Sequence, residues 1–349
     1  MISAAKHNEN KGNELMGVKV FWQKTTFWRN LIQWSFFIWI GYLGIRFGQF
    51  VQHFTSQGAT PFVTRPTGVD GFLPIGGLAS LKLLVTTGQF DTLHPASLVL
   101  LLTFLAMSLV TKKSFCSWLC PVGTLSEGAW KLGRRSFGRT LTVWRWLDIV
   151  LRGMKYLLLA FFIKIILIDM PAAALAAFLK TPYWAVSDVK MLNFFTQMSL
   201  TTMIVLTVVT LLSFFVKNAW CRYLCPYGAL LGLVSLISPF KIRRDTTTCT
   251  DCRECTRTCP ARISVHSRIS VMNAECTGCL SCVEACPHGS LAMSVCGLRK
   301  PLPRWVFPVV LLTFYAAGVG LGMVSGHWES ALGYQDYQRL IPLIDHLSH

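Results

Sequence analysis

The arrangement of the cysteines constrains this chain more than any other feature. Eight of its 13 cysteines form two copies of the pattern C-x2-C-x2-C-x3-C-P, at residues 249–260 and 276–287. Three thiolates spaced in this way can bind three irons of one cubane from a tight loop, while the fourth cysteine reaches the other cubane. The pattern therefore predicts two 4Fe-4S clusters in a bacterial ferredoxin-like α+β domain.

This crossed arrangement assigns four ligands to each cluster. The predicted ligands are Cys249, Cys252, Cys255 and Cys286 for the first cluster, and Cys276, Cys279, Cys282 and Cys259 for the second. Zinc or disulfides are the alternatives, but zinc sites do not require eight cysteines in a doubled spacing, and disulfides between such close neighbours would be strained. The apolar residues expected to cover the clusters are Ile263, Val265, Ile269, Val271, Leu291, Met293 and Val295.

The rest of the chain is too apolar for a soluble protein. Of its 349 residues, 52% are hydrophobic and only 14% are charged, and the mean hydropathy is +0.47. Apolar segments long enough to cross a hydrocarbon core of ~30 Å lie at residues 31–50, 95–111, 148–170, 198–216 and 305–324. We therefore expect a membrane all-α bundle of about five transmembrane helices in contact with membrane lipid.

The positions of the basic residues predict the orientation of the bundle. Segments 1–30, 112–147 and 217–304 hold 5, 7 and 12 Lys and Arg residues, whereas segments 51–94, 169–197 and 325–349 hold 2, 2 and 1. By the positive-inside rule, the N-terminus and all cysteine motifs face the cytoplasm and the C-terminus faces the periplasm. The same rule explains the net charge of +17 without a nucleic-acid partner. The first 30 residues show no cleavable signal, so the first apolar run is expected to be a retained anchor in the bacterial inner membrane.

These observations divide the chain into four parts. The predicted parts are a cytoplasmic N-terminal segment at 1–30, a four-span membrane domain at 31–239, the ferredoxin-like domain at 240–300, and a fifth transmembrane helix with a periplasmic tail at 301–349.

One sequence repeat lies within the membrane domain. The segment FCSWLCPVGTL at 115–125 matches WCRYLCPYGAL at 220–230, and each copy follows the cytoplasmic end of a predicted span. Two pseudo-repeats are therefore expected. Each copy holds two cysteines that are expected to lie one helical turn apart on a common face. The pairs are Cys116 with Cys120 and Cys221 with Cys225. The second cysteine precedes a proline suited to the first position of a new helix.

If the two halves meet at a pseudo-twofold axis, these four thiols converge beneath the bilayer. They could hold a third metal centre, bind a metal ion transiently, cycle between dithiol and disulfide, or only shape the helix turns. The sequence alone leaves these alternatives open.

Three histidines offer a second possible site. His53, His94 and His327 fall near the outer ends of predicted spans. There they could accept protons from quinol or ligate a haem. The alternative is that they are interfacial residues among Trp and Tyr anchors.

Taken together, the two C-x3-C-P copies and the doubled ferredoxin motif resemble the NapH and NosR type of membrane ferredoxin-like proteins, a group that includes CcoG. The resemblance covers about residues 30–290 and is closest in plan to the NapH-type quinol dehydrogenase subunit. It implies a polytopic protein with cytoplasmic clusters that supplies electrons from quinol to periplasmic reductases. The chain lacks the large outer domain that could carry a NosR-like flavin, and it has a fifth span and a tail at 326–349 beyond a minimal NapH-like chain.

The sequence therefore predicts an iron-sulfur protein that moves electrons between the quinol pool and a partner redox protein, periplasmic or cytoplasmic. Four arginines beside the cluster motifs could dock an acidic partner: Arg253, Arg257, Arg262 and Arg268. The rival prediction is a copper-reducing assembly factor for a respiratory oxidase, with the C-x3-C-P thiols as delivery site. A redox sensor that acts by docking is the third.

Overall fold

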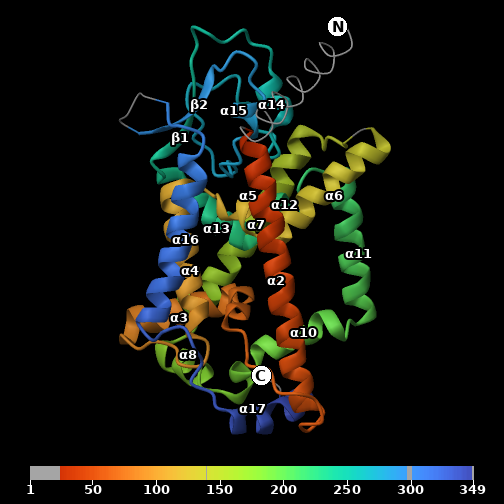
Figure 1. Ribbon diagram of the computed structural model, residues 1–349, viewed down its shortest axis with the longest axis vertical. Helices are drawn as coiled ribbons and strands as arrows, with labels where there is room; N and C mark the ends of the chain where they lie inside the picture. The colour runs from red at the N-terminus through yellow and green to blue at the C-terminus, as the bar shows by residue number, and fades with distance from the viewer. Residues whose placement is uncertain (1–23, 139, 297–300, 348–349) are drawn as a thin grey trace, which may run out of the picture.

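Five long helices form the body of the molecule, and the ferredoxin-like unit lies at one end of them (Figure 1). The computed structural model describes residues 24–138, 140–296 and 301–347, so most of the predicted N-terminal segment lies outside the described residues. The long helices are α2 (Thr25–Thr55), α4 (Pro95–Thr111), α7 (Arg145–Ile163), α11 (Leu200–Phe215) and α16 (Val306–Val324). Each segment predicted to cross the membrane is therefore helical, although the bounds differ.

Few of these helices are long and apolar enough by themselves to cross a bilayer. Within the described residues, α16 alone combines the required length and hydropathy. Two bent pairs do so only when each pair is taken as one span: α7 and its π-helical continuation Lys164–Asp169 with α8 (Ala172–Phe178), bent by 105°, and α10 (Ser187–Thr196) with α11, bent by 75°. The number of five spans stays a prediction.

A layer of short helices closes the end opposite the ferredoxin-like unit (Figure 1). Besides α8 and α10, it contains η1 (Thr67–Phe72), α3 (Pro74–Thr87), α9 (Pro182–Ala185), α17 (Tyr334–Leu340) and η4 (Ile341–His346). Pro74 and Pro182 begin their helices because the fixed φ of proline suits the first turn. Lys82 of α3 donates to the carbonyls of Ile166 at 3.0 Å and Leu167 at 3.1 Å, near the bend after α7.

The sequence repeat is also a structural repeat. In the first copy α4 is followed by α5 (Phe115–Trp118) and α6 (Pro121–Phe137); in the second, α11 is followed by α12 (Ala219–Tyr223) and α13 (Pro226–Val234), which continues into η3 (Ser235–Ile237). The prediction that the two cysteines of a copy share one helical face is wrong, because the helix breaks between them. Cys120 and Cys225 are extended, as expected for residues before proline, and each is the N-cap of the next helix.

The ferredoxin-like unit is small and mixed. Strand β1 (Phe240–Arg244) pairs antiparallel with β2 (Leu291–Val295), and two short helices, α14 (Glu254–Thr258) and α15 (Ser281–Glu284), carry cysteines of the two motifs. Most of the residues predicted to cover the clusters are buried or partly buried. Ile269 is the exception and is 68% exposed.

A buried ion pair joins the start of α2 to α6 beneath the ferredoxin-like unit. The Arg29 guanidinium pairs with Glu127, and both side chains are less than 10% exposed. Gln33 donates to the second oxygen of Glu127 at 3.2 Å. Lys131 also pairs with Glu127, at 2.7 Å, but is 44% exposed. Only the first pair is therefore removed from water.

We expect Glu127→Gln to lower the free energy of unfolding by about 3 kcal/mol, because it leaves the Arg29 charge buried without an anion. Lys131→Met, which removes the exposed partner, should cost less than about 1 kcal/mol. Denaturation of the purified protein in detergent measures both. Equal losses of unfolding free energy in the two variants would contradict the conclusion that the Arg29–Glu127 pair is the one removed from water.

Candidate metal centres

The first predicted cluster site is a cavity between the two cysteine motifs. Its lining includes all four predicted ligands, Cys249, Cys252, Cys255 and Cys286. Burial raises the pKa of the Cys255 thiol, and the neighbouring Cys286 and Cys252 thiols add to this effect. Cys286 therefore lies with the three cysteines of the other motif, which is the placement that crossed ligation requires.

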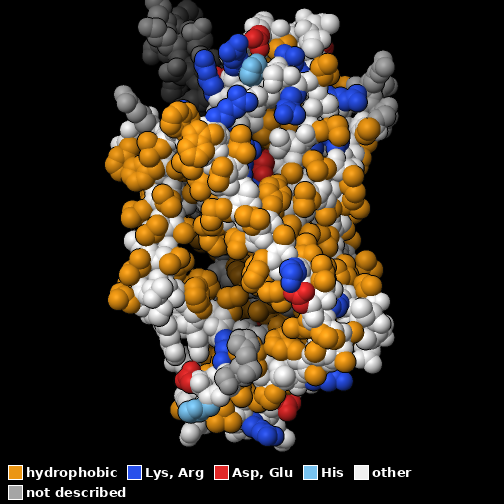
Figure 2. Space-filling view, turned by 180° about the vertical axis from the view of Figure 1, so that it is seen from behind, with side chains coloured by type: hydrophobic (Ala, Val, Ile, Leu, Met, Phe, Trp, Pro, Cys, Tyr) orange, Lys and Arg blue, Asp and Glu red, His pale blue; other side chains and the backbone are white. Residues whose placement is uncertain are grey.

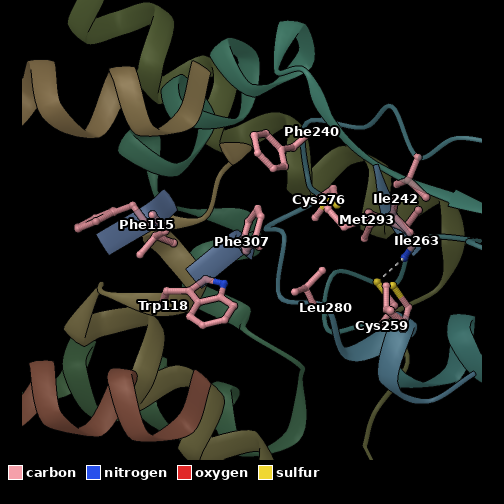
Figure 3. Packing of buried hydrophobic residues seen from close by; sticks show 14 of the residues in the cluster. Phe115, Trp118, Phe240, Ile242, Cys259, Ile263, Cys276, Leu280, Met293 and Phe307 are labelled. Atoms are coloured by element: carbon pink, nitrogen blue, oxygen red, sulfur yellow. Dashed lines mark hydrogen bonds between the residues drawn. The ribbon is translucent and has the colours of Figure 1, made fainter. Parts of the chain in front are cut away.

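The second predicted site is deeper. Its predicted ligands Cys259, Cys276, Cys279 and Cys282 are all buried. Burial raises the pKa of Cys259 to about 12, and the nearby Cys279 and Cys276 thiols contribute to the rise. The Ile263 amide donates to the Cys259 sulfur at 3.5 Å (Figure 3). Four clustered, buried cysteines suit a metal centre, since binding iron holds such thiols as thiolates.

The backbone of both motifs is shaped to wrap a group. The residues on either side of the second cysteine have left-handed conformations in each copy: Asp251 and Arg253 at φ 54° and 60°, and Gly278 and Leu280 at 62° and 59°. Such conformations turn amide groups toward the inside of a loop and recur at iron-sulfur sites. Three of the four residues are not glycine, so the strain is tolerated twice at matching positions.

The four C-x3-C-P thiols converge, although they come from segments 105 residues apart in the sequence. Burial and the adjacent Cys120 and Cys225 thiols together raise the pKa of Cys116 to about 12. Burial and all three other thiols raise the pKa of Cys221. We call Cys116, Cys120, Cys221 and Cys225 the thiol quartet.

A lysine and two glycines complete the surroundings of the thiol quartet. Burial lowers the pKa of Lys113, but the Cys116 thiol, Glu275 and two further quartet thiols outweigh it and raise the pKa. A Cβ atom on Gly123 would lie 2.2 Å from the Cys116 carbonyl oxygen, so α6 can start there only with glycine. At Gly228 a Cβ would lie 3.5 Å from the Cys225 sulfur, and the Gly228 amide donates to that sulfur at 3.2 Å.

The loop of the second cluster site rests directly on the first C-x3-C-P turn. Ser117 donates to the Thr277 carbonyl at 2.7 Å, and the Trp118 indole donates to the Gly278 carbonyl at 3.2 Å. Figure 3 shows Trp118 and Phe307 between Phe115 and this loop. A Cβ on Gly278 would lie 2.8 Å from the Phe307 ring, so only glycine allows this contact.

Charged residues strengthen this junction from the other side. Lys155 of α7 is fully buried and donates to both oxygens of Glu275, at 2.5 and 2.7 Å, and Tyr156 donates to one of them at 3.2 Å. A small cavity is lined jointly by Cys116, Cys221, Glu275 and Pro260, the residue after Cys259. The thiol quartet and the second cluster site are therefore neighbours.

The three sites lie in series. Cys282 of the second site also neighbours Cys255 of the first. Cys252 of the first site is exposed, whereas all predicted ligands of the second site are buried. The order from helix bundle to surface is thus thiol quartet, second cluster site and first cluster site.

The three predicted histidines occupy separate environments. His53 contacts the Thr60 carbonyl at 2.5 Å and the Tyr334 hydroxyl at 2.9 Å. His94 contacts Asp70 at 3.0 Å and the Trp184 carbonyl at 2.9 Å, which engages both ring nitrogens and leaves neither for a haem iron. His327 packs against Phe90 with ring centroids 4.2 Å apart and ring planes tilted by 52°.

His94 belongs to a buried charge cluster that the sequence analysis missed. Asp70, His94 and Asp188 bring ligand atoms within 4.8 Å of one another, as a cation site would. Arg65 already supplies the cation: it contacts Asp70 at 2.5 Å and Asp188 at 2.7 Å. Asp188 lies 123 residues from Arg65 in the sequence, and no local spacing signals their meeting. We interpret the cluster as an ion-pair network that holds the outer helices together.

Comparison with known families supports the binding of iron-sulfur clusters. A family model described as "4Fe-4S binding domain" matches twice, at residues 93–140 and 198–245, and so covers both copies of the C-x3-C-P repeat. A second model, "4Fe-4S dicluster domain", matches residues 241–287. The "Putative electron transport protein YccM" of Escherichia coli K12 is 46% identical over 337 residues, covering 94% of this chain and 93% of the relative. The chain belongs to the NapH-like family of 4Fe-4S electron-transfer proteins.

More distant members of the NapH-like family match in part. The "Ferredoxin-type protein NapH" of Escherichia coli K12 is 25% identical over 263 residues, which is 73% of this chain and 82% of NapH. The "Methylamine utilization ferredoxin-type protein MauN" of Paracoccus denitrificans is 34% identical over 169 residues, 48% of this chain and 54% of MauN. No solved structure matches the chain significantly.

The crossed ligation can be tested with Cys286→Ala. Because Cys286 lies with Cys249, Cys252 and Cys255, we expect this variant to damage the first cluster and to spare the second. EPR of the anaerobically reduced protein, with iron analysis, separates the two signals. Cys259→Ala is the matched control and should damage the second cluster. Loss of only the second signal in Cys286→Ala would refute the assignment.

Proposed function

We propose that this protein is an electron-transfer subunit of the inner membrane that moves electrons between the quinol pool and a partner redox protein, as a quinol dehydrogenase does. The observation that carries the proposal is the series of three cysteine sites, which leads from the helix bundle to the exposed Cys252. A site within the bundle gives access to a lipid-soluble donor, and a site at the surface gives access to a protein.

The membrane setting is part of the proposal. On the face shown in Figure 2, hydrophobic side chains cover the middle of the molecule, and many basic side chains gather at one end. Many large apolar residues are exposed, among them Leu157 at 71%, Leu200 at 73% and Val324 at 90%. Contact of so much apolar surface with water would be unfavourable. We infer a multi-pass protein with five spans, cytoplasmic clusters and a periplasmic C-terminus.

Twelve cysteines would hold the metal groups. The eight ferredoxin-motif cysteines would bind two 4Fe-4S clusters in the crossed arrangement, and the thiol quartet would bind a third iron-sulfur centre. When bound, such clusters supply one-electron redox steps. The protein contributes the buried thiols, the amides that point at sulfur, and Lys113, whose charge offsets the anionic ligands.

The surface around the first site suits a protein partner. Arg253 and Arg257 are 63% and 73% exposed, and Arg268 is exposed too. Basic side chains around an exposed ligand attract an acidic partner and steer its approach. The partner we propose is therefore an acidic redox protein or subunit on the cytoplasmic side, or a complex that returns the electrons to the periplasm.

Copper handling is the second candidate. Four converging thiols are a soft ligand set that also suits Cu(I). An assembly factor would deliver copper from the thiol quartet to an oxidase. The match of the "4Fe-4S binding domain" model across all four quartet cysteines favours iron instead.

Iron analysis tests the third centre. We expect about twelve irons per chain in the parent and about eight in a variant with serine at Cys116, Cys120, Cys221 and Cys225. Serine at Cys296, which lies outside every motif and is exposed, is the control and should keep the parent value. Equal iron content in parent and quartet variant would refute the third iron centre, and stoichiometric Cu(I) at the quartet would favour the assembly factor.

Anaerobic EPR tests the electron donor. A quinol analogue added to the oxidised protein should produce the EPR signals of the reduced clusters. In the quartet variant these signals should appear much more slowly. Dithionite should reduce the ferredoxin clusters of both proteins alike, which serves as the control. Clusters that dithionite reduces and quinol does not would reject the quinol dehydrogenase proposal.

A further inference from the structure

A cavity of about 300 Å³ lies between α2, η1, α4 and α16. This volume is within the range of sites for small organic molecules. The side chains that line it are all described, and none of them is charged. Aromatic rings supply much of the wall, including Trp39, Phe104, Tyr315 and Trp328. The cavity therefore suits a flat and neutral molecule.

Polar groups in the wall have no protein partner. The Tyr315 hydroxyl is partly buried and makes no hydrogen bond to any described residue; its ring contacts are with Phe36 and Phe104. Thr67 and the indole of Trp328 also line the cavity without a hydrogen bond from the described chain. A partly buried hydroxyl without a partner is costly, so an occupant with its own hydroxyl or carbonyl groups would stabilise this wall.

The inner end of the cavity reaches the thiol quartet through aromatic rings. Phe115 and Pro121, which belong to the first C-x3-C-P copy, line the cavity. Phe115 stacks on Phe104 with ring centroids 3.9 Å apart and meets Tyr227 edge-on at 6.1 Å. Tyr227 in turn lies close to the thiols of Cys116, Cys120 and Cys225. The aromatic route from the cavity to the quartet thus runs through Phe115 and Tyr227.

The mouth of the cavity faces the surface that we propose to contact lipid. Trp39 of α2 is 52% exposed and Met323 of α16 is 55% exposed. An occupant that enters between these helices comes from the bilayer and carries an apolar tail. Neutrality, a flat ring, hydrogen-bonding groups and an apolar tail together describe an isoprenoid quinol, and they describe a phospholipid less well because its head group is charged.

We propose that this cavity binds the ring of an isoprenoid quinol or quinone, with the Tyr315 hydroxyl as a hydrogen-bond partner and the tail leaving between α2 and α16. The inference rests on the proposed function and names the binding site for its lipid-soluble donor. Apart from Phe115 and Pro121, the residues that line the cavity lie outside the cysteine motifs.

Direct binding tests the proposal. The full-length protein in detergent is incubated with an azido-quinone photolabel, and the labelled peptides are identified by mass spectrometry. We expect labels on α2, α4 or α16 beside the cavity, displaced by an excess of a decyl quinone. Labels confined to other surfaces, or labels that the decyl quinone does not displace, would overturn the assignment.

Two variants sharpen this test. Tyr315→Phe removes only the hydroxyl and should weaken decyl quinone binding three- to tenfold, the value of one hydrogen bond. Val319→Trp should block the cavity and abolish labelling. Tyr42→Phe, on the exposed face of α2, is the matched control and should bind like the parent. Unchanged EPR spectra in the dithionite-reduced variants show that they fold. Parent-like binding in both Tyr315→Phe and Val319→Trp would refute the site.

The outcomes separate the cavity from the proposed function. If quinol reduces the clusters but the photolabel marks another surface, the cavity assignment fails and the function stands. If the decyl quinone binds the cavity and quinol leaves the clusters oxidised, the site stands and the quinol dehydrogenase proposal fails. A phospholipid photolabel that occupies the cavity and resists displacement by quinone would replace the quinol with a structural lipid.

Discussion

The contact between the second cluster loop and the first C-x3-C-P turn is the junction on which the rest of the structure depends. Two hydrogen bonds from Ser117 and Trp118 hold the loop at Thr277 and Gly278. These bonds fix the polar ferredoxin-like unit to helices whose outer surface is apolar.

Buried charge reinforces the same junction. Lys155 and Glu275 are paired at 2.5 Å, and Arg222 holds Asp148 at 2.8 Å through two donors while its third nitrogen reaches the Ala261 carbonyl at 2.7 Å. Such pairs contribute little net stability because the desolvation of both ions opposes their attraction. Their geometric demand is strict, however, so they fix the orientation of the unit on α7 and α12. We regard orientation as their main effect.

Much of the fold and site could be predicted from local sequence patterns. The doubled cysteine spacing predicted the α+β unit, and the proline after each second quartet cysteine predicted a helix start. Both rest on local geometry. The face shared by Cys116 and Cys120 was predicted wrongly because the same proline also forces the preceding residue out of the helix. The burial of Ile269 was also predicted wrongly, although Val271, two residues later, is buried as expected.

The sequence by itself predicted the cysteine ligand sets and determined the repeat, the helical segments and the family resemblance, because each follows from spacing or composition within a short stretch. Tertiary structure alone decided that Cys116 and Cys221 meet, that Arg65 joins Asp70 and Asp188, and that a cavity ends beside Phe115. These arrangements depend on how distant helices pack. Packing is set by the sum of many weak contacts and by bends such as the 75° turn between α10 and α11, which no local pattern encodes.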